Sequence, residues 1–130
     1  AYLTPEHFDT PMTYEALREI GADVGHGGVV VFDDSVKMAE QARYAFEFCA
    51  EESCGKCTPC RIGSVRGAEL MGQIIEGGGK ERFALLDDLC AVMEDSSMCA
   101  MGSMTPKPVR SALKYFPQDF GLERVGAEDR

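Results

Sequence analysis

Three cysteines stand within seven residues, in the segment Cys54-Gly-Lys-Cys57-Thr-Pro-Cys60. Three thiolates at three-residue intervals can converge from one loop on three corners of an iron–sulfur cubane. The loop has to curl around the cluster, and Gly55 and Pro59 supply the unusual backbone angles for that. The spacing therefore predicts a [4Fe–4S] cluster whose fourth ligand lies elsewhere in the chain.

Two other kinds of site fit part of this pattern. Cys54 and Cys57 have the CxxC spacing of a thioredoxin-like dithiol, but that interpretation leaves Cys60 unexplained and places the motif between helices instead of after a strand. A structural zinc site usually draws two ligands from each of two knuckles, and the sequence has no second CxxC pair. A thiol–disulfide oxidoreductase and a zinc docking domain therefore stay as alternatives to the cluster.

The remaining cysteines are the candidates for the fourth ligand. Cys49 and Cys90 fall on apolar helical stripes, and free cysteine is among the most buried residue types, so both are expected in the core. Cys99 falls in a segment predicted to be irregular, Ser96–Met104, with apolar neighbours on both sides. A loop cysteine that is flanked by apolar residues suits a cluster shielded from water. Cys99 is therefore the predicted fourth ligand.

Basic residues in and beside the cysteine segment are expected to support the cluster. A cubane with four thiolate ligands carries a net negative charge, which is costly to bury without compensation. Lys56 lies within the segment and Arg61 follows its last cysteine directly. Both are predicted to stand close behind the ligands and to stabilise the reduced state.

Apolar side chains recur at helical spacing in four stretches, which predicts a small four-helix bundle. Asp33–Ser35 offer three possible N-caps for the first helix, and Gly77–Gly79 ends the second. Thr105 is expected to cap the last helix, which begins at Pro106. The expected inward-facing residues are Met38, Ala42, Ala45, Phe46 and Cys49, then Ile62, Val65, Ala68, Met71 and Ile75, then Phe83, Leu86, Leu89, Cys90 and Met93, and finally Val109, Ala112, Leu113 and Phe116.

The first 33 residues have a different pattern. Thr13 can cap a short helix through Ile20, and the apolar, β-branched run Val29–Phe32 predicts a buried strand. A single strand cannot satisfy its own backbone groups, so this part is expected to be the tail of an α+β domain. The predicted organisation is residues 1–33 as that tail, 34–122 as the cluster-binding bundle and 123–130 as an acidic tail.

Charge and composition exclude several classes of function. The net charge of −9 argues against binding to nucleic acid or to anionic membranes, because both need clustered Lys and Arg. No run approaches the roughly 18 apolar residues of a membrane helix, and the first residues lack the features of a secretory signal. A cytoplasmic protein without membrane insertion is expected. The missing initiator Met suggests a processed chain or a fragment.

The segment from Glu52 to Gly63, Glu-Ser-Cys-Gly-Lys-Cys-Thr-Pro-Cys-Arg-Ile-Gly, resembles the cluster-binding C-terminal region of NADH-oxidising flavoprotein subunits. That family includes the flavoprotein subunit of respiratory complex I, the diaphorase subunits of NAD-linked hydrogenases and the β subunit of NAD-dependent formate dehydrogenases. A second match, Ser97-Met-Cys-Ala-Met-Gly102, is similar to the family's Ser-Leu-Cys-x-Leu-Gly around the fourth ligand, and so supports Cys99.

This resemblance runs from about Met12 to Phe120 and implies an electron-transfer module of an NAD-linked oxidoreductase. Such a module relays single electrons between FMN and further iron–sulfur clusters on partner subunits, with Ala100 and Met101 on its flavin-facing side. The first motif and the segment Met104–Leu113 most resemble the formate dehydrogenase β subunit. Residues 1–33 would be the end of a ubiquitin-like, soluble-ligand-binding-type domain. The family's FMN and NAD sites are not in these 130 residues, so no catalytic residue is expected here.

Overall fold

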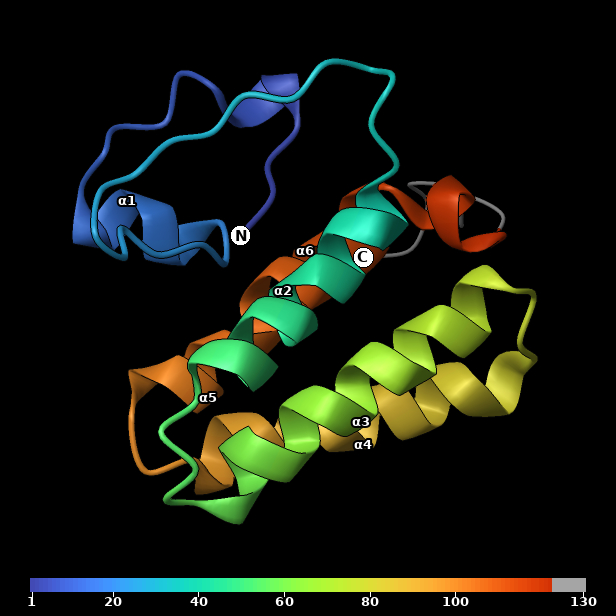
Figure 1. Ribbon diagram of the computed structural model, residues 1–130. Coiled ribbons are helices and arrows are strands. Elements are labelled where there is room, and N and C mark those ends of the chain that lie inside the picture. Colours follow the sequence, from blue (N-terminus) through green and yellow to red (C-terminus); the bar gives the residue numbers. More distant parts are fainter. Residues whose placement is uncertain (123–130) are drawn as a thin grey trace.

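The computed structural model describes residues 1–122, and four of its helices form a bundle (Figure 1). These are α2 (Met38–Glu52), α3 (Thr58–Ile75), α4 (Lys80–Ser96) and α6 (Pro106–Tyr115). Helix α2 packs against α3 and α6, and α3 packs against α4 as well. The short helix α5 (Ala100–Met104) joins α4 to α6, and the 3₁₀ helix η2 (Pro117–Phe120) follows α6. The predicted mainly α fold is confirmed, and the acidic tail lies outside the described residues.

The segment before α2 lies beside the bundle, on the side of α2 and α6 (Figure 1). It contains the 3₁₀ helix η1 (Pro5–His7) and the short helix α1 (Tyr14–Glu19). The backbone N–H of Tyr2 donates to Ser111 Oγ in α6 over 2.8 Å, and Lys107 Nζ stands 3.0 Å from a carboxylate oxygen of Asp23. The predicted cap of α1 is confirmed, since Thr13 Oγ1 accepts the N–H of Ala16 over 3.2 Å.

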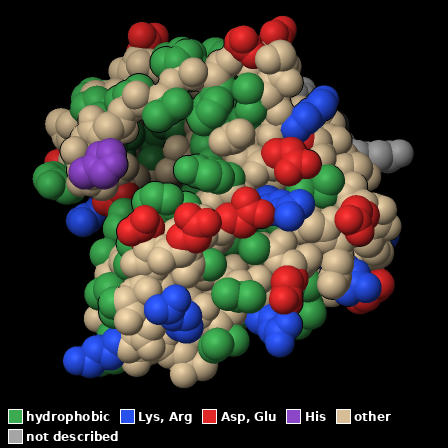
Figure 2. All heavy atoms as spheres, in the orientation of Figure 1, with side chains coloured by type: hydrophobic (Ala, Val, Ile, Leu, Met, Phe, Trp, Pro, Cys, Tyr) green, Lys and Arg blue, Asp and Glu red, His purple; other side chains and the backbone are tan. Residues whose placement is uncertain are grey.

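The predicted buried strand over Val29–Phe32 is wrong. Residues 1–122 contain no β-strand, and Val29, Val30 and Val31 are 71%, 73% and 82% exposed. A strand is stabilised by the hydrogen bonds of a neighbouring strand, and no described segment supplies one. Hydrophobic side chains consequently gather around a hollow over this part of the molecule, whereas charged side chains are spread over the helices (Figure 2).

The core lies between the four long helices and depends on two glycines of α3. A Cβ on Gly67 would lie 2.4 Å from the ring of Phe46 in α2, and one on Gly63 would lie 2.9 Å from the side chain of Met93 in α4. The neighbouring helices therefore approach the backbone of α3 closely. The predicted core faces of α2, α4 and α6 are confirmed, with the fully buried residues Ala42, Phe46, Cys49, Leu86, Cys90, Met93, Val109 and Ala112.

The predicted inward face of α3 is partly wrong. The spacing places Ile62 and Val65 in the core, but they are 50% and 42% exposed. Met71 is fully buried as expected, and the two glycines take the inward positions beside it. The physical reason is volume, because Phe46 and Met93 already fill the space that β-branched side chains from α3 would need.

The start of α2 is capped from a distant part of the chain. The predicted caps within Asp33–Ser35 are wrong, since Asp33 instead closes its own turn by accepting the N–H of Ser35 over 3.0 Å. Lys37 precedes the helix and makes no side-chain cap. The first N–H of α2, that of Met38, donates to Asp119 Oδ2 in η2 over 2.6 Å. A carboxylate at this position also favours the positive end of the helix dipole.

The end of α3 and the start of α6 match the sequence pattern to different degrees. Helix α3 ends before Gly77, as predicted, and this glycine has a φ of +97°. Helix α6 begins at Pro106, as predicted, but Thr105 does not cap it. Its hydroxyl donates to the carbonyl of Met101 over 2.7 Å, because the turn before it is already the helix α5. The second half of the segment predicted to be irregular is therefore helical.

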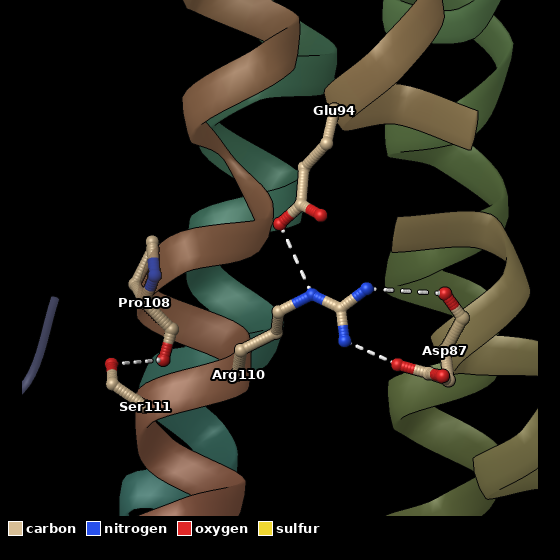
Figure 3. A network of polar contacts seen from close by, with 5 residues as sticks. All are labelled: Asp87, Glu94, Pro108, Arg110 and Ser111. Carbon is tan, nitrogen blue, oxygen red and sulfur yellow. Dashed lines mark hydrogen bonds and ion pairs between the residues drawn. The ribbon is translucent and has the colours of Figure 1, made fainter. Parts of the chain in front are cut away.

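Helices α4 and α6 are joined by a polar network around one arginine (Figure 3). Arg110 of α6 places Nε 3.0 Å from Glu94 Oε1, and its Nη1 pairs with the carboxylate of Asp87. Its Nη2 also donates to the backbone carbonyl of Asp87 over 3.4 Å. The planar guanidinium thus uses three of its N–H groups to hold two turns of α4 against α6.

Candidate cluster-binding site

The cysteine segment forms the turn between α2 and α3, at one end of the bundle (Figure 1). Cys54 is exposed in the loop, Cys57 is the residue before α3, and Cys60 is buried in the first turn of α3. Gly55 has a φ of +79°, a left-handed conformation that reverses the chain between the first two cysteines. The three predicted ligands therefore present their thiols from one turn and the helix start that follows it.

The segment that holds Cys99 lies against this turn. Hydrogen bonds from the backbone N–H groups of Met98 and then Cys60 lower the pKa of Cys57 below its usual value. The residue just before Cys99 therefore lies near Cys57. Cys99 itself is exposed and directly precedes α5. The structure brings the two cysteine segments, about forty residues apart in sequence, to the same end of the bundle.

Close packing of α5 on α3 fixes this arrangement. A Cβ on Gly102 would lie 2.8 Å from Cys60 Cβ and 2.3 Å from Ser97 Oγ, so only glycine fits there. The hydroxyl of Ser97 is buried and has no hydrogen-bond partner within residues 1–122. A buried polar atom without a partner needs an explanation, and a sulfur-rich group held beside it would supply an acceptor.

Two buried side chains at the end of α2 contact the sulfur of Cys60. Ser53 Oγ lies 3.2 Å from Cys60 Sγ, and Cys49 Sγ lies 3.7 Å from it. Burial raises the pKa of Cys60, and the contact with Ser53 works in the opposite direction. Ser53 is not among the residues singled out from the sequence, although its position four residues after Cys49 places both on one face of a helix.

Arg61 secures the same turn from behind. Its Nη2 donates to the carbonyl of Ser53 over 2.8 Å and its Nη1 to that of Ala50 over 3.4 Å, so it covers the last carbonyls of α2. The guanidinium also lies over Gly55, where an added Cβ would be 2.6 Å from Nη2. Lys56 is exposed and forms no hydrogen bond or ion pair with any residue that the structure describes.

The other residues singled out from the sequence occupy separate surroundings. Cys90 is buried in the middle of α4, where burial raises its pKa to about 12. Cys49 is also buried, as expected, and its sulfur contacts that of Cys60. Ala100 and Met101 are exposed on α5, beside Cys99.

The donor set can be tested against two kinds of metal centre. Within residues 1–122, no three His, Cys, Asp or Glu side chains come together closely enough to hold one metal ion. A zinc ion needs its ligands around a single atom, whereas the cysteines of a cubane bind separate irons and stand farther apart. The cysteine turn packs against the segment that follows Cys99 at one end of the bundle, with the unpartnered hydroxyl of Ser97 beside them, and this arrangement suits a group held by several separate ligands.

The fold and the site together define a class, the small helical bundle with cysteines from two segments gathered at one end. The chain belongs to the family described as the NADH-ubiquinone oxidoreductase-F iron-sulfur binding region, which it matches over residues 40–123. Its cofactor is accordingly a [4Fe–4S] cluster. None of the helices among the described residues is both long and apolar enough to cross a membrane.

Curated relatives and a solved structure agree with this family. The chain is 34% identical over 119 residues to the NADP-reducing hydrogenase subunit HndC of Solidesulfovibrio fructosivorans (91% of this chain, 24% of the relative). It is 35% identical over 118 residues to the NADH-quinone oxidoreductase subunit designated F, from Streptomyces coelicolor (90% and 26%). A crystal structure of NAD⁺-reducing [NiFe]-hydrogenase in the H₂-reduced state matches with a TM-score of 0.64 and 31% identity (69% of this chain, 16% of that chain). The chain spans about a quarter of the length of these curated relatives.

Proposed function

We propose that this chain is the electron-transfer module of an NAD-linked oxidoreductase, with Cys54, Cys57, Cys60 and Cys99 as the four ligands of its cluster. The close packing of Gly102 on Cys60 carries the proposal, because it sets the turn of three cysteines against the segment that contains the fourth. A cluster held there would supply one-electron transfer. The residues around it shield it, compensate its charge and hold its ligands.

The same proposal places the module within a larger enzyme. FMN and the nicotinamide cofactor would bind outside this chain, with Ala100 and Met101 on the flavin-facing side and further iron–sulfur clusters on partner subunits. The relatives named above support this, because they are named as subunits of hydrogenases and quinone oxidoreductases. A role in formate dehydrogenase rests on the sequence of the cysteine motif and stays a prediction. A location in the cytoplasm also stays a prediction.

Residues 1–33 are proposed to be the end of a ubiquitin-like domain of that larger protein. The exposed apolar run Val29–Val31 supports this, because it has the composition of a strand and lacks a neighbouring strand among the described residues.

Reconstitution with iron and sulfide in the absence of oxygen tests the ligand set. The wild-type chain should gain the full iron and sulfide content of one cubane, a brown colour and the electron paramagnetic resonance (EPR) signal of a reduced [4Fe–4S] cluster. Cys99→Ala should lose the cubane, because the fourth iron loses its thiolate. Cys90→Ala should keep the cubane, because Cys90 is buried in the core on α4 and is not a predicted ligand.

Two outcomes would contradict the proposal. If Cys90→Ala lost the cubane and Cys99→Ala kept it, the fourth ligand would be wrong. If metal-free protein reduced insulin disulfides through Cys54 and Cys57, the dithiol alternative would be favoured instead.

A further inference from the structure

We infer that Ser53 and Cys49 donate hydrogen bonds to the iron-bound sulfur of Cys60 and thereby raise the reduction potential of the cluster. The inference rests on the proposed function, because it takes Cys60 as a ligand. It goes beyond that function by assigning a role to two side chains that are not themselves ligands.

The geometry comes from the last turn of α2. The backbone N–H of Ser53 donates to the carbonyl of Cys49 over 2.9 Å, so the two residues are stacked one turn apart. Both side chains are buried, Cys49 at 1% and Ser53 at 6% exposure, and both meet Cys60 Sγ in the first turn of α3. The turn of α2 thus covers one side of this sulfur and excludes water from it.

The direction of the bond from Ser53 follows from the protons that are available. A protonated Cys60 can donate to Ser53 Oγ, but a thiolate bound to iron has no proton to give. The hydroxyl of Ser53 has one proton, and its oxygen already accepts the N–H of Gly55 over 3.3 Å. Within residues 1–122 the hydroxyl has no other acceptor, so with the cluster bound it donates to the sulfur.

The thiol of Cys49 has two possible acceptors, Cys60 Sγ and the carbonyl of Met101, each 3.7 Å away. The carbonyl already accepts the hydroxyl of Thr105 over 2.7 Å. The sulfur of a thiolate carries negative charge, and charge strengthens a hydrogen bond. The Cys49 thiol therefore donates to Cys60, as a weaker donor than the hydroxyl of Ser53.

Both donors favour the reduced cluster. Reduction adds one negative charge that is shared among iron, sulfide and thiolate sulfur, so a hydrogen bond to sulfur stabilises the reduced state more than the oxidised one. Removing a donor should lower the midpoint potential and leave the number of ligands unchanged.

The test is a redox titration of the reconstituted full chain, followed by the EPR signal of the reduced cluster. At the wild-type midpoint potential, Ser53→Ala should show a ratio of reduced to oxidised cluster about tenfold lower, which is about 59 mV for a one-electron couple. Cys49→Ala should shift the ratio in the same direction by less. Ser53→Thr keeps a hydroxyl at the same position and should stay near the wild-type value.

Matched controls separate hydrogen bonding from packing. Ser64 is also buried, but its hydroxyl donates to the backbone carbonyl of Cys60 over 2.7 Å and not to the sulfur. Ser64→Ala should therefore leave the potential unchanged, and Cys90→Ala serves the same purpose for Cys49→Ala. An equal shift in Ser53→Ala and Ser64→Ala, or a shift in Ser53→Thr as large as in Ser53→Ala, would overturn the inference.

A second measurement does not depend on the potential. In electron–nuclear double resonance of the reduced wild-type cluster, exchange into D₂O should remove a strongly coupled proton that is missing in Ser53→Ala. Its persistence in Ser53→Ala would overturn the inference. If Ser53→Ala fails to hold a cluster, the potential of Cys49→Ala decides, and a midpoint equal to that of the wild type would overturn the inference. Failure of the wild type to form a cubane would instead contradict the proposed function.

Discussion

The bundle formed by residues 38–122 and the segment of residues 1–37 differ in where they keep their apolar side chains. The bundle buries large residues such as Phe46, Met71 and Met93 completely. The earlier segment buries Leu17 and Ala22 but leaves Phe8 and Val29–Val31 mostly exposed. Helices satisfy their own backbone groups and can pack in any combination that fits, whereas an extended chain needs a neighbouring strand. The four long helices therefore share a core, whereas the large apolar side chains of the earlier segment are mostly exposed.

The largest effect is expected when one large side chain is removed from each region. Phe46→Ala should lower the free energy of unfolding by about 3–5 kcal/mol, because it leaves a cavity under the close contact with Gly67. Val30→Ala should change it by less than about 0.5 kcal/mol, because Val30 is 73% exposed. Urea unfolding followed by circular dichroism measures both. A comparable loss in Val30→Ala would mean that the earlier segment has a core of its own.

A smaller effect is expected when a methyl group is added inside the bundle. Gly67→Ala should lower the free energy of unfolding by about 1–3 kcal/mol, because the new methyl group clashes with the ring of Phe46.

Gly72 is a matched control for this change in the same helix. An added Cβ there would meet its nearest neighbour, Arg43 Nη1, at 3.8 Å. Gly72→Ala should therefore raise stability by up to about 1 kcal/mol through helix propensity alone. Equal effects of the two substitutions in urea unfolding would contradict close packing of α2 on α3.

The smallest effect is expected at the polar contact between α4 and α6. Arg110→Ala should lower the free energy of unfolding by about 1 kcal/mol, since its side chain is 39% exposed and solvent screens its two ion pairs. The loss should shrink in about 1 M salt, where the Debye length is about 3 Å. Arg66→Ala, which removes an exposed pair within α3, should have no measurable effect. A loss that did not change with salt would assign the role of Arg110 to packing.

The sequence predicted those features that depend on spacing along one segment. The turn of Cys54, Cys57 and Cys60, the core faces of three helices and the start of α6 all follow from local patterns. The approach of Cys99 to that turn was expected from its neighbours and from family resemblance, and α5 provides it in the structure.

The features that were missed depend on contacts between distant segments. The inward face of α3 is set by Phe46 and Met93, which no periodicity within α3 reveals. Ser53 could have been found, because it ends a helix four residues after Cys49. The cap of Asp119 on α2 could not, because the two are 81 residues apart.

That cap has a consequence for how the chain is made. During synthesis, α2 leaves the ribosome long before Asp119 does, so its first turn emerges without the carboxylate that completes it. The same holds for Tyr2, because the acceptor of its backbone N–H, Ser111 Oγ, is made 109 residues later. Contacts that close such long loops form late. The bundle is thus expected to reach its native state only after α6 and η2 have emerged, whereas every residue of the cysteine turn is made well before then.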